Sequence, residues 1–237
     1  MTWSIIAREA QTGRVGIAVA TRFFAVGSRV PHIRTGVGAV ATQAFVNKSY
    51  GPRGLDLMAG GLQAGAVLEQ LVSADTGRDH RQVHLMDAAG TIAAYTGSAC
   101  VDWCGHHVGP DFSVAGNMLA GPQVIARTAE EFTATTGQSL ARRLIAAMRA
   151  GETAGGDKRG KQSAALLVHD AEEFPIYDIR VDDHADPLTE LARLHAVARE
   201  RFVHFRRRMP SRAHPDGIVD RHDLEDFIAA SIAEGYE

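Results

Sequence analysis

The sequence predicts an α+β protein in which antiparallel sheets are covered by pairs of helices. Strand-like runs occur as hairpins, and segments with a helical spacing of apolar residues occur in pairs between them. A parallel sheet would instead alternate single strands with single crossover helices. With 237 residues, of which 45% are hydrophobic, the chain is long enough to bury one sizeable core.

The first half of the chain predicts two groups of strands around one pair of helices. β-rich runs occur at 3–7, 15–20 and 37–45, and Thr12-Gly13 forms a turn between the first two. From 54 to 74 the apolar positions take helical spacing, and glycines at 60, 61 and 65 divide this segment into two short helices. Strands return at 82–86 and 91–95 around the turn that ends at Gly90.

The second half repeats this order. An extended segment at 112–117 precedes a helix at 124–135 and a second helix in which Leu140, Leu144 and Met148 lie on one face. Strands follow at 163–169 and 176–181. Asp186-Pro187 then has the pattern of an N-cap followed by a first-turn proline, which predicts the last long helix of the chain.

A change of composition predicts that one domain covers residues 1–205 and that residues 206–237 form an appendage. Three arginines at 206–208 precede a segment rich in proline and glycine, and we interpret them as a solvated helix end. A short amphipathic helix follows, with an apolar stripe of Leu224, Phe227, Ile228 and Ile232. This stripe has to cover either its own domain or a second subunit, and we expect a homodimer.

The charge of the chain favours a small-molecule partner. The formal net charge is only −3, which gives no general attraction to nucleic acid or to an anionic membrane surface. The sequence has no signal-peptide pattern and no apolar run long enough to span a membrane, so we expect a cytoplasmic protein. Two cysteines, Cys100 and Cys104, are too few for a disulfide framework.

The position of Thr2 suggests a chemical role. A threonine hydroxyl is a poor nucleophile without a base, and an α-amino group titrates near neutral pH. Removal of Met1 before the small Thr2 side chain would place both groups on one residue. Threonine is also an ordinary β-favouring residue, so its position alone is weak evidence of catalysis.

Seven segments, in order along the chain, carry a resemblance to a known family. They are TWSIIARE, GIAVATRFFAVGSRVP, GVGAVATQAFVNKSYGPRGL, RQVHLMDAAGTIAAYTG, FSVAGNML, LIAAMRAGETAGGDKRGKQSAALLV and VDDHADPLTELARL. Together they closely resemble the uncharacterised DUF1028 family of the N-terminal nucleophile (Ntn) hydrolase superfamily, over about the first 195 residues. The resemblance implies a four-layer αββα sandwich of two antiparallel sheets, and a hydrolytic chemistry without a defined substrate.

Amide hydrolysis through Thr2 would need hydrogen-bond donors around the nucleophile. Asn117, in the matched segment FSVAGNML, can donate to an oxyanion or hold the Thr2 amine, although an asparagine after glycine is also common in turns. Thr42 and Gln43 end another matched run and can supply donors beside Asn117. A buried polar pair that is satisfied within the sheet is equally consistent with their sequence.

A glycine-rich loop, GETAGGDKRGK, supplies candidate substrate-binding residues. Asp157 and Arg159 lie between glycines, where the backbone can approach a ligand and a guanidinium can bind a carboxylate through two hydrogen bonds. A solvated turn would have the same composition. Arg22 ends the second strand among apolar neighbours, so we expect it to pair with Asp157 or to bind substrate.

The sequence does not predict a metal site or a cofactor. The segment CVDWCGHH would crowd four ligands into one turn, and VDDHAD has no second element to complete a site. Two hypotheses remain. One is an amidohydrolase that uses Thr2 on a small carboxylate-bearing amide or ureido compound; the other is a catalytically inactive binding or scaffold protein with the same fold.

Overall fold

The computed structural model describes residues 2–236, which divide into two compact units, one up to Leu191 and one from Ala192. The first unit contains two antiparallel sheets. The larger sheet has the order β10-β9-β2-β1-β8-β7 and the smaller one β3-β4-β5-β6. The larger sheet comprises β1 (Thr2–Arg8), β2 (Val15–Thr21), β7 (Gly105–Val108), β8 (Phe112–Asn117), β9 (Ser163–His169) and β10 (Tyr177–Val181). The smaller sheet comprises β3 (Pro31–Arg34), β4 (Gly38–Ala44), β5 (Arg81–Asp87) and β6 (Ile92–Thr96).

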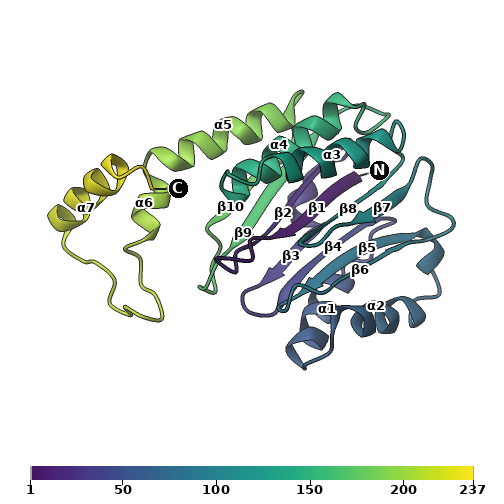
Figure 1. Cartoon of the computed structure of the whole chain (residues 1–237), viewed down its shortest axis with the longest axis horizontal. Helices are drawn as coiled ribbons and strands as arrows, with labels where there is room; N and C mark the ends of the chain where they lie inside the picture. The colour runs from purple at the N-terminus through teal and green to yellow at the C-terminus, as the bar shows by residue number, and fades with distance from the viewer. Residues whose placement is uncertain (1, 237) are drawn as a thin grey trace. The chain divides into compact units, whose positions relative to one another are not determined.

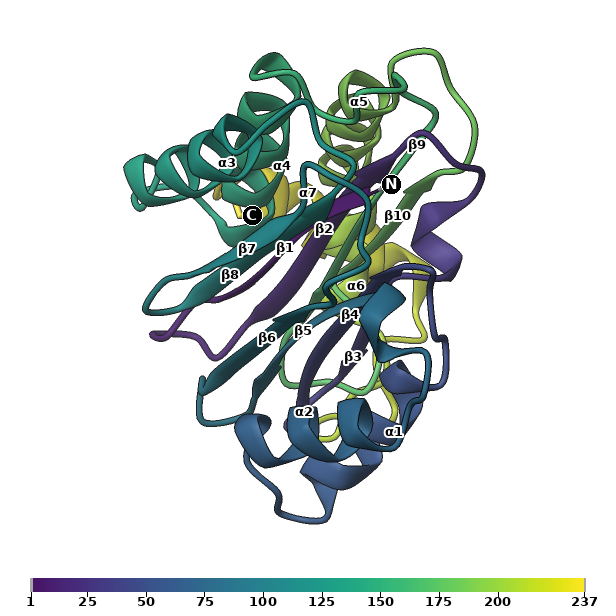
Figure 2. The same ribbon diagram turned by 90° about the vertical axis from the view of Figure 1, so that its right-hand side faces the viewer.

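Four layers follow from the way each sheet buries its two faces. The outer face of the larger sheet is covered by α3 (Gln123–Ala134) and α4 (Leu140–Thr153), and that of the smaller sheet by α1 (Tyr50–Ala59) and α2 (Ala64–Ser73), as Figures 1 and 2 show. The inner faces of the two sheets pack against each other. The predicted α+β class and the αββα sandwich are confirmed.

Most of the predicted elements are present, and two short strands are additional. The helix pair before residue 74 is divided at Gly60 and Gly61 as predicted, whereas Gly65 lies within α2 and does not break it. The first helix, α1, begins at Tyr50 rather than near Gly54. The strands β3 and β7 were not predicted. Both have four residues and lie at sheet edges, so neither shows the full alternation of a half-buried strand. Two 3₁₀ turns, η1 (Val26–Ser28) and η2 (Arg78–His80), complete this unit.

The alternation of side chains along each strand determines what fills the space between the sheets. On β1, Ile6 belongs to a buried apolar cluster that Ile17 and Val19 of β2 and Ala39 and Ala41 of β4 share. Trp3 points toward the helices instead. Its indole Nε1 is so close to Gly151 of α4 that a Cβ atom added there would lie only 3.0 Å from it. The odd positions of β1 therefore face the helices, and the even positions face the second sheet.

Three helices follow the sheets: α5 (Pro187–Glu200), α6 (Phe202–Arg206) and α7 (Arg221–Ala233). Hydrogen bonds to Thr189 lower the pKa of the Asp186 carboxyl, as expected if Asp186 caps α5. No helix within residues 2–236 has both the length and the apolarity to cross a membrane.

The predicted apolar stripe on α7 is buried only in part. Ile228 is buried and Ile232 is about half exposed. Between α6 and α7, His204 pairs with Ser231 and Arg201 pairs with Glu225. Arg206, which we expected to be solvated, is only 9% exposed, so the interpretation of the triplet as a solvated helix end is wrong for this residue. Arg207 and Arg208, which follow the end of α6, are exposed.

Candidate functional site

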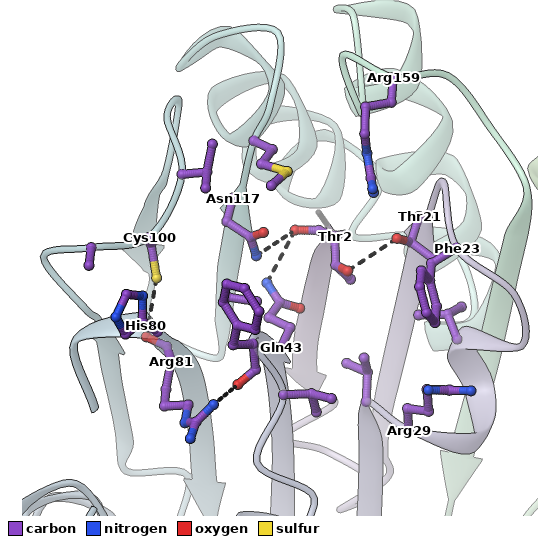
Figure 3. A pocket seen from close by; sticks show the side chains of 18 residues that line it. Thr2, Thr21, Phe23, Arg29, Gln43, His80, Arg81, Cys100, Asn117 and Arg159 are labelled. Atoms are coloured by element: carbon purple, nitrogen blue, oxygen red, sulfur yellow. Dashed lines mark hydrogen bonds between the residues drawn. The ribbon is translucent and has the colours of Figure 1, made fainter. Parts of the chain in front are cut away.

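The candidate site is a cavity of about 440 Å³ at the end of the inter-sheet layer where β1 begins. Thr2 of β1, Gln43 of β4 and Asn117 of β8 all line it, together with Arg159 from the glycine-rich loop (Figure 3). Both sheets therefore contribute to its wall. Three of these residues are our candidate catalytic residues, which the sequence separates by up to 115 positions.

Two neighbouring strands hold Thr2 in place. β1 lies between β2 and β8, and Thr2 stands opposite Asn117 in the register of β1 and β8. The Thr2 side chain lines the cavity, although the residue is only 7% exposed, and its Oγ1 lies 3.2 Å from Oγ1 of Thr21. Backbone pairing with β8 on one side and the hydroxyl contact with Thr21 of β2 on the other give the Thr2 hydroxyl a defined position in the wall of the cavity.

The Thr2 carbonyl is the acceptor for two side-chain amides. Gln43 Nε2 donates to it over 3.4 Å and Asn117 Nδ2 over 3.3 Å. The same two amide groups also donate to Oε1 of Gln82, at 2.8 and 3.0 Å. Both hydrogens of Asn117 Nδ2 are therefore used within the protein, and an oxyanion would need a different donor in this conformation.

Gln82 is a residue that the sequence analysis missed. It is completely buried, and its Nε2 lies 2.8 Å from the Gly116 carbonyl and 3.0 Å from the Gly105 carbonyl. It connects β5 of one sheet with β7 and β8 of the other. A signal was present in the sequence, because Gln82 and His84 alternate with Val83 and Leu85 along one strand. Polar residues at every second position of a buried strand indicate a polar face.

The polar layer continues one step deeper at His84. Ser4 Oγ donates to Gln43 Oε1 over 2.8 Å, so it must accept from Nε2 of His84, which lies 2.8 Å away. Nδ1 of His84 then accepts from Ser113 Oγ at 2.7 Å. Burial lowers the pKa of His84 to about 3, and the nearby His106 contributes in the same direction. His84 is therefore neutral, and its tautomer sets the direction of the hydrogen bonds toward Gln43.

Two residues of the cavity wall have left-handed backbone conformations. Ala44 follows Gln43 with φ of 68°, and Met118 follows Asn117 with φ of 54°. Each costs about 1–2 kcal/mol for a residue with a Cβ atom. Backbone strain of this kind is concentrated at functional sites, where the surrounding structure holds it. Here it occurs directly after the two amides that hold Thr2.

The glycine-rich loop is organised by Asp157. Its buried carboxylate accepts from the backbone N–H groups of Arg22, at 2.7 Å, and of Arg159, at 2.8 Å. The Arg159 guanidinium pairs with it at 3.2 Å. In Figure 3 the Arg159 side chain extends toward Thr2 and Thr21. Asp157 therefore holds the loop that brings Arg159 to the cavity.

The structure does not bring the Arg22 side chain into this cavity wall. Its Nη1 donates to Gln162 Oε1 over 3.1 Å, and its link to Asp157 runs through the backbone N–H rather than the guanidinium. Asp157 is also outside the wall. Of the three candidate substrate-binding residues, Arg159 alone lines the cavity, and their roles in binding stay predictions.

Cysteine and metal chemistry have little support in the described part of the chain. Cys100 lines the cavity, but burial raises the pKa of its thiol, so the nucleophilic thiolate is disfavoured at neutral pH. Burial likewise raises the pKa of Cys104. Within residues 2–236, no three His, Cys, Asp or Glu side chains are grouped as metal ligands would be. Thr2 remains the candidate nucleophile.

Comparisons with known proteins identify a family but no activity. The model of a family of unknown function, DUF1028, matches residues 2–191. A crystal structure of a DUF1028 protein from Silicibacter pomeroyi is 32% identical with a TM-score of 0.86, and the match covers 93% of this chain and 96% of that one. No curated protein matches the sequence.

A weaker likeness concerns Anbu, an ancestral beta-subunit from Yersinia bercovieri. It is 7% identical with a TM-score of 0.43, covering 83% of this chain and 94% of that chain. A likeness at this level supports neither a shared fold nor a shared activity.

Proposed function

We propose that this chain, which belongs to the DUF1028 family, is an Ntn-type hydrolase that cleaves a C–N bond of a small carboxylate-bearing molecule. The nucleophile is the hydroxyl of Thr2, and removal of Met1 exposes the α-amino group that serves as its base. The observation that carries the proposal is the position of Thr2, whose hydroxyl lines a cavity at the first residue of a doubly paired strand.

The reaction has two halves. In the first, the Thr2 amine takes the hydroxyl proton, Oγ1 attacks the substrate carbonyl, and the proton passes to the departing nitrogen as the C–N bond breaks. In the second, the amine takes a proton from water, and the resulting hydroxide displaces Oγ1 from the acyl group. The acid product leaves, and Thr2 regains its hydroxyl proton.

The surrounding residues support this chemistry by holding Thr2. Gln43 and Asn117 fix its carbonyl, and Thr21 lies within hydrogen-bond distance of its hydroxyl. Asn117 Oδ1 accepts no hydrogen bond from residues 2–236 in this arrangement, so it is available to orient the exposed amine. Arg159 is the candidate contact for the substrate close to the scissile bond.

Intact mass and three variants test the proposal. The purified protein should lack Met1, because a retained methionine blocks the amine. Thr2→Ala should lower turnover of acyl-amino acids, γ-glutamyl amides and carbamoyl acids by at least about a thousandfold while the fold is kept. Thr2→Ser should retain measurable activity, since it keeps the hydroxyl and the amine.

The matched control is Thr153→Ala, which removes an exposed hydroxyl at the end of α4 and should leave turnover unchanged. Equal turnover by Thr2→Ala would exclude Thr2 as the nucleophile. A processed protein that binds members of this panel but hydrolyses none would favour the inactive binding protein.

A further inference from the structure

The cavity wall combines apolar side chains with an unbalanced positive charge. Of the 18 side chains that line it, three are arginines, Arg29, Arg81 and Arg159, and none is acidic. Its apolar part is formed largely by Phe23, Val26, Val30, Phe45, Val46, Val101 and Met118. A ligand of this cavity would therefore meet mostly apolar surface and a few cations.

Two of the three arginines are neutralised by carboxylates outside the wall. Arg81 Nε lies 3.1 Å from Asp75, and several hydrogen bonds, that from Asn47 the strongest, lower the pKa of this carboxyl. Arg159 pairs with Asp157, whose side chain is only 1% exposed. A substrate anion at either arginine would also feel the negative charge of the partner carboxylate.

Arg29 differs from both. Its guanidinium forms no hydrogen bond or ion pair with any residue between 2 and 236; what it contacts is the Phe23 ring, 5.1 Å from the ring centroid. Nε is buried and has no acceptor among the described residues. The two terminal nitrogens, by contrast, are not buried. A partly buried cation next to an aromatic ring and without a carboxylate is suited to bind an anion from outside the protein.

From this charge balance we infer that Arg29 binds the carboxylate of the substrate, and that the substrate is a monoanion whose other groups are mainly apolar. This inference rests on the proposed function and specifies its substrate class. One uncompensated cation matches one carboxylate, while the apolar wall disfavours a second buried charge. In Figure 3, Arg29 lies below Phe23 and farther from Thr2 than Phe23 does. The carboxylate and the scissile bond therefore occupy different parts of the cavity.

Binding to a protein that cannot turn over provides the test. In a Thr2→Ala background, calorimetry would compare the N-acetyl and N-carbamoyl derivatives of leucine and phenylalanine with their methyl esters and with N-acetylglutamate. The monocarboxylates should bind most tightly. Arg29→Gln should weaken their binding about ten- to a hundredfold, toward that of the esters, because a charge-assisted pair is lost. Arg29→Lys should fall between the two, since it keeps the charge without the planar fork.

The control is Arg53→Gln, which removes an exposed arginine of α1 outside the cavity and should leave binding unchanged. The inference is overturned if no monocarboxylate binds more tightly than its ester, if the dicarboxylate binds best, or if Arg29→Gln binds like its parent. Failure of the proposed function looks different. In that case processed wild-type protein hydrolyses none of the compounds, while Arg29-dependent binding persists in the Thr2→Ala background.

Discussion

Two buried layers of this protein, one on each face of β4 and β5, have opposite compositions. The layer toward α1 and α2 is an apolar cluster, with buried members Val40, Tyr50, Leu55, Met58, Ala64, Val67, Leu71, Val83 and Leu85. The layer toward the larger sheet is apolar only at the end that contains Ile6 and Met86. Toward the cavity it becomes polar, with Ser4, Gln43, Gln82, His84, Ser113 and Asn117, all at most 1% exposed.

The difference shows that a gain in stability from burial does not explain why the second layer is polar. A buried amide or hydroxyl needs a hydrogen-bond partner to offset its loss of water, and at best the exchange gives a small net gain. Apolar residues of similar size would pack there without this requirement. The hydrogen bonds instead converge on the Thr2 carbonyl. We interpret the polar layer as a device that positions Thr2, and the apolar layer as a source of stability.

The largest expected effect on stability lies in the apolar layer. Leu71→Ala should lower the free energy of unfolding by about 4 kcal/mol, because Leu71 is 1% exposed and its removal leaves a cavity between α2 and the sheet. Urea unfolding would measure the loss. Turnover per folded molecule should be unchanged, since this layer does not contact Thr2. A comparable loss of turnover would contradict the separation of the two layers.

Gln82→Met, in contrast to Leu71→Ala, should lower turnover as well as stability. It removes the acceptor of Gln43 and Asn117 and the donor to two carbonyls, so the free energy of unfolding should fall by about 3 kcal/mol. The decisive measurement is turnover, which should fall more than a hundredfold in kcat with a smaller change in KM, because Thr2 loses its position. An unchanged kcat in folded protein would mean that the layer is only structural.

The pH dependence of stability tests His84. Its pKa is lowered from 6.5 to about 3 in the folded protein, so between these values the unfolded chain binds a proton that the folded one does not. The contribution of His84 to the free energy of unfolding is therefore fully present above about pH 6.5. It falls as the pH drops, by about 2 kcal/mol between pH 7 and pH 5.

Urea unfolding at both pH values should show this extra loss in wild type and in His107→Gln, a change at an exposed histidine, but not in His84→Gln. The same pH dependence in His84→Gln would assign the effect to other groups.

The sequence predicts the fold better than it predicts the site. Trp3 and the hairpin around Gly13 indicate β1 and β2 locally, because alternation and turn chemistry act over a few residues. The contact between Gln82 and Asn117 joins two sheets across 35 positions, and periodicity within one strand does not specify which strand faces it. Arg29 was not predicted either, because its lack of a carboxylate partner depends on the positions of residues elsewhere in the chain.

The smallest expected effect concerns the backbone at the polar end of the layer. Ala44→Gly removes the Cβ atom at a φ of 68°, so relief of strain exceeds the greater entropy of glycine in the unfolded chain. The free energy of unfolding should rise by up to about 1 kcal/mol.

Ala41→Gly is the matched control, since Ala41 lies on the same strand within the apolar cluster and has no left-handed conformation. It should lower the same free energy by about 1 kcal/mol, because it loses a buried methyl group as well as stiffness. If the backbone beside Gln43 is strained, urea unfolding will show changes of opposite sign in the free energy of unfolding of the two variants. If both variants are destabilised equally, the cavity wall is as relaxed as the rest of β4, and the two ends of the layer differ only in polarity.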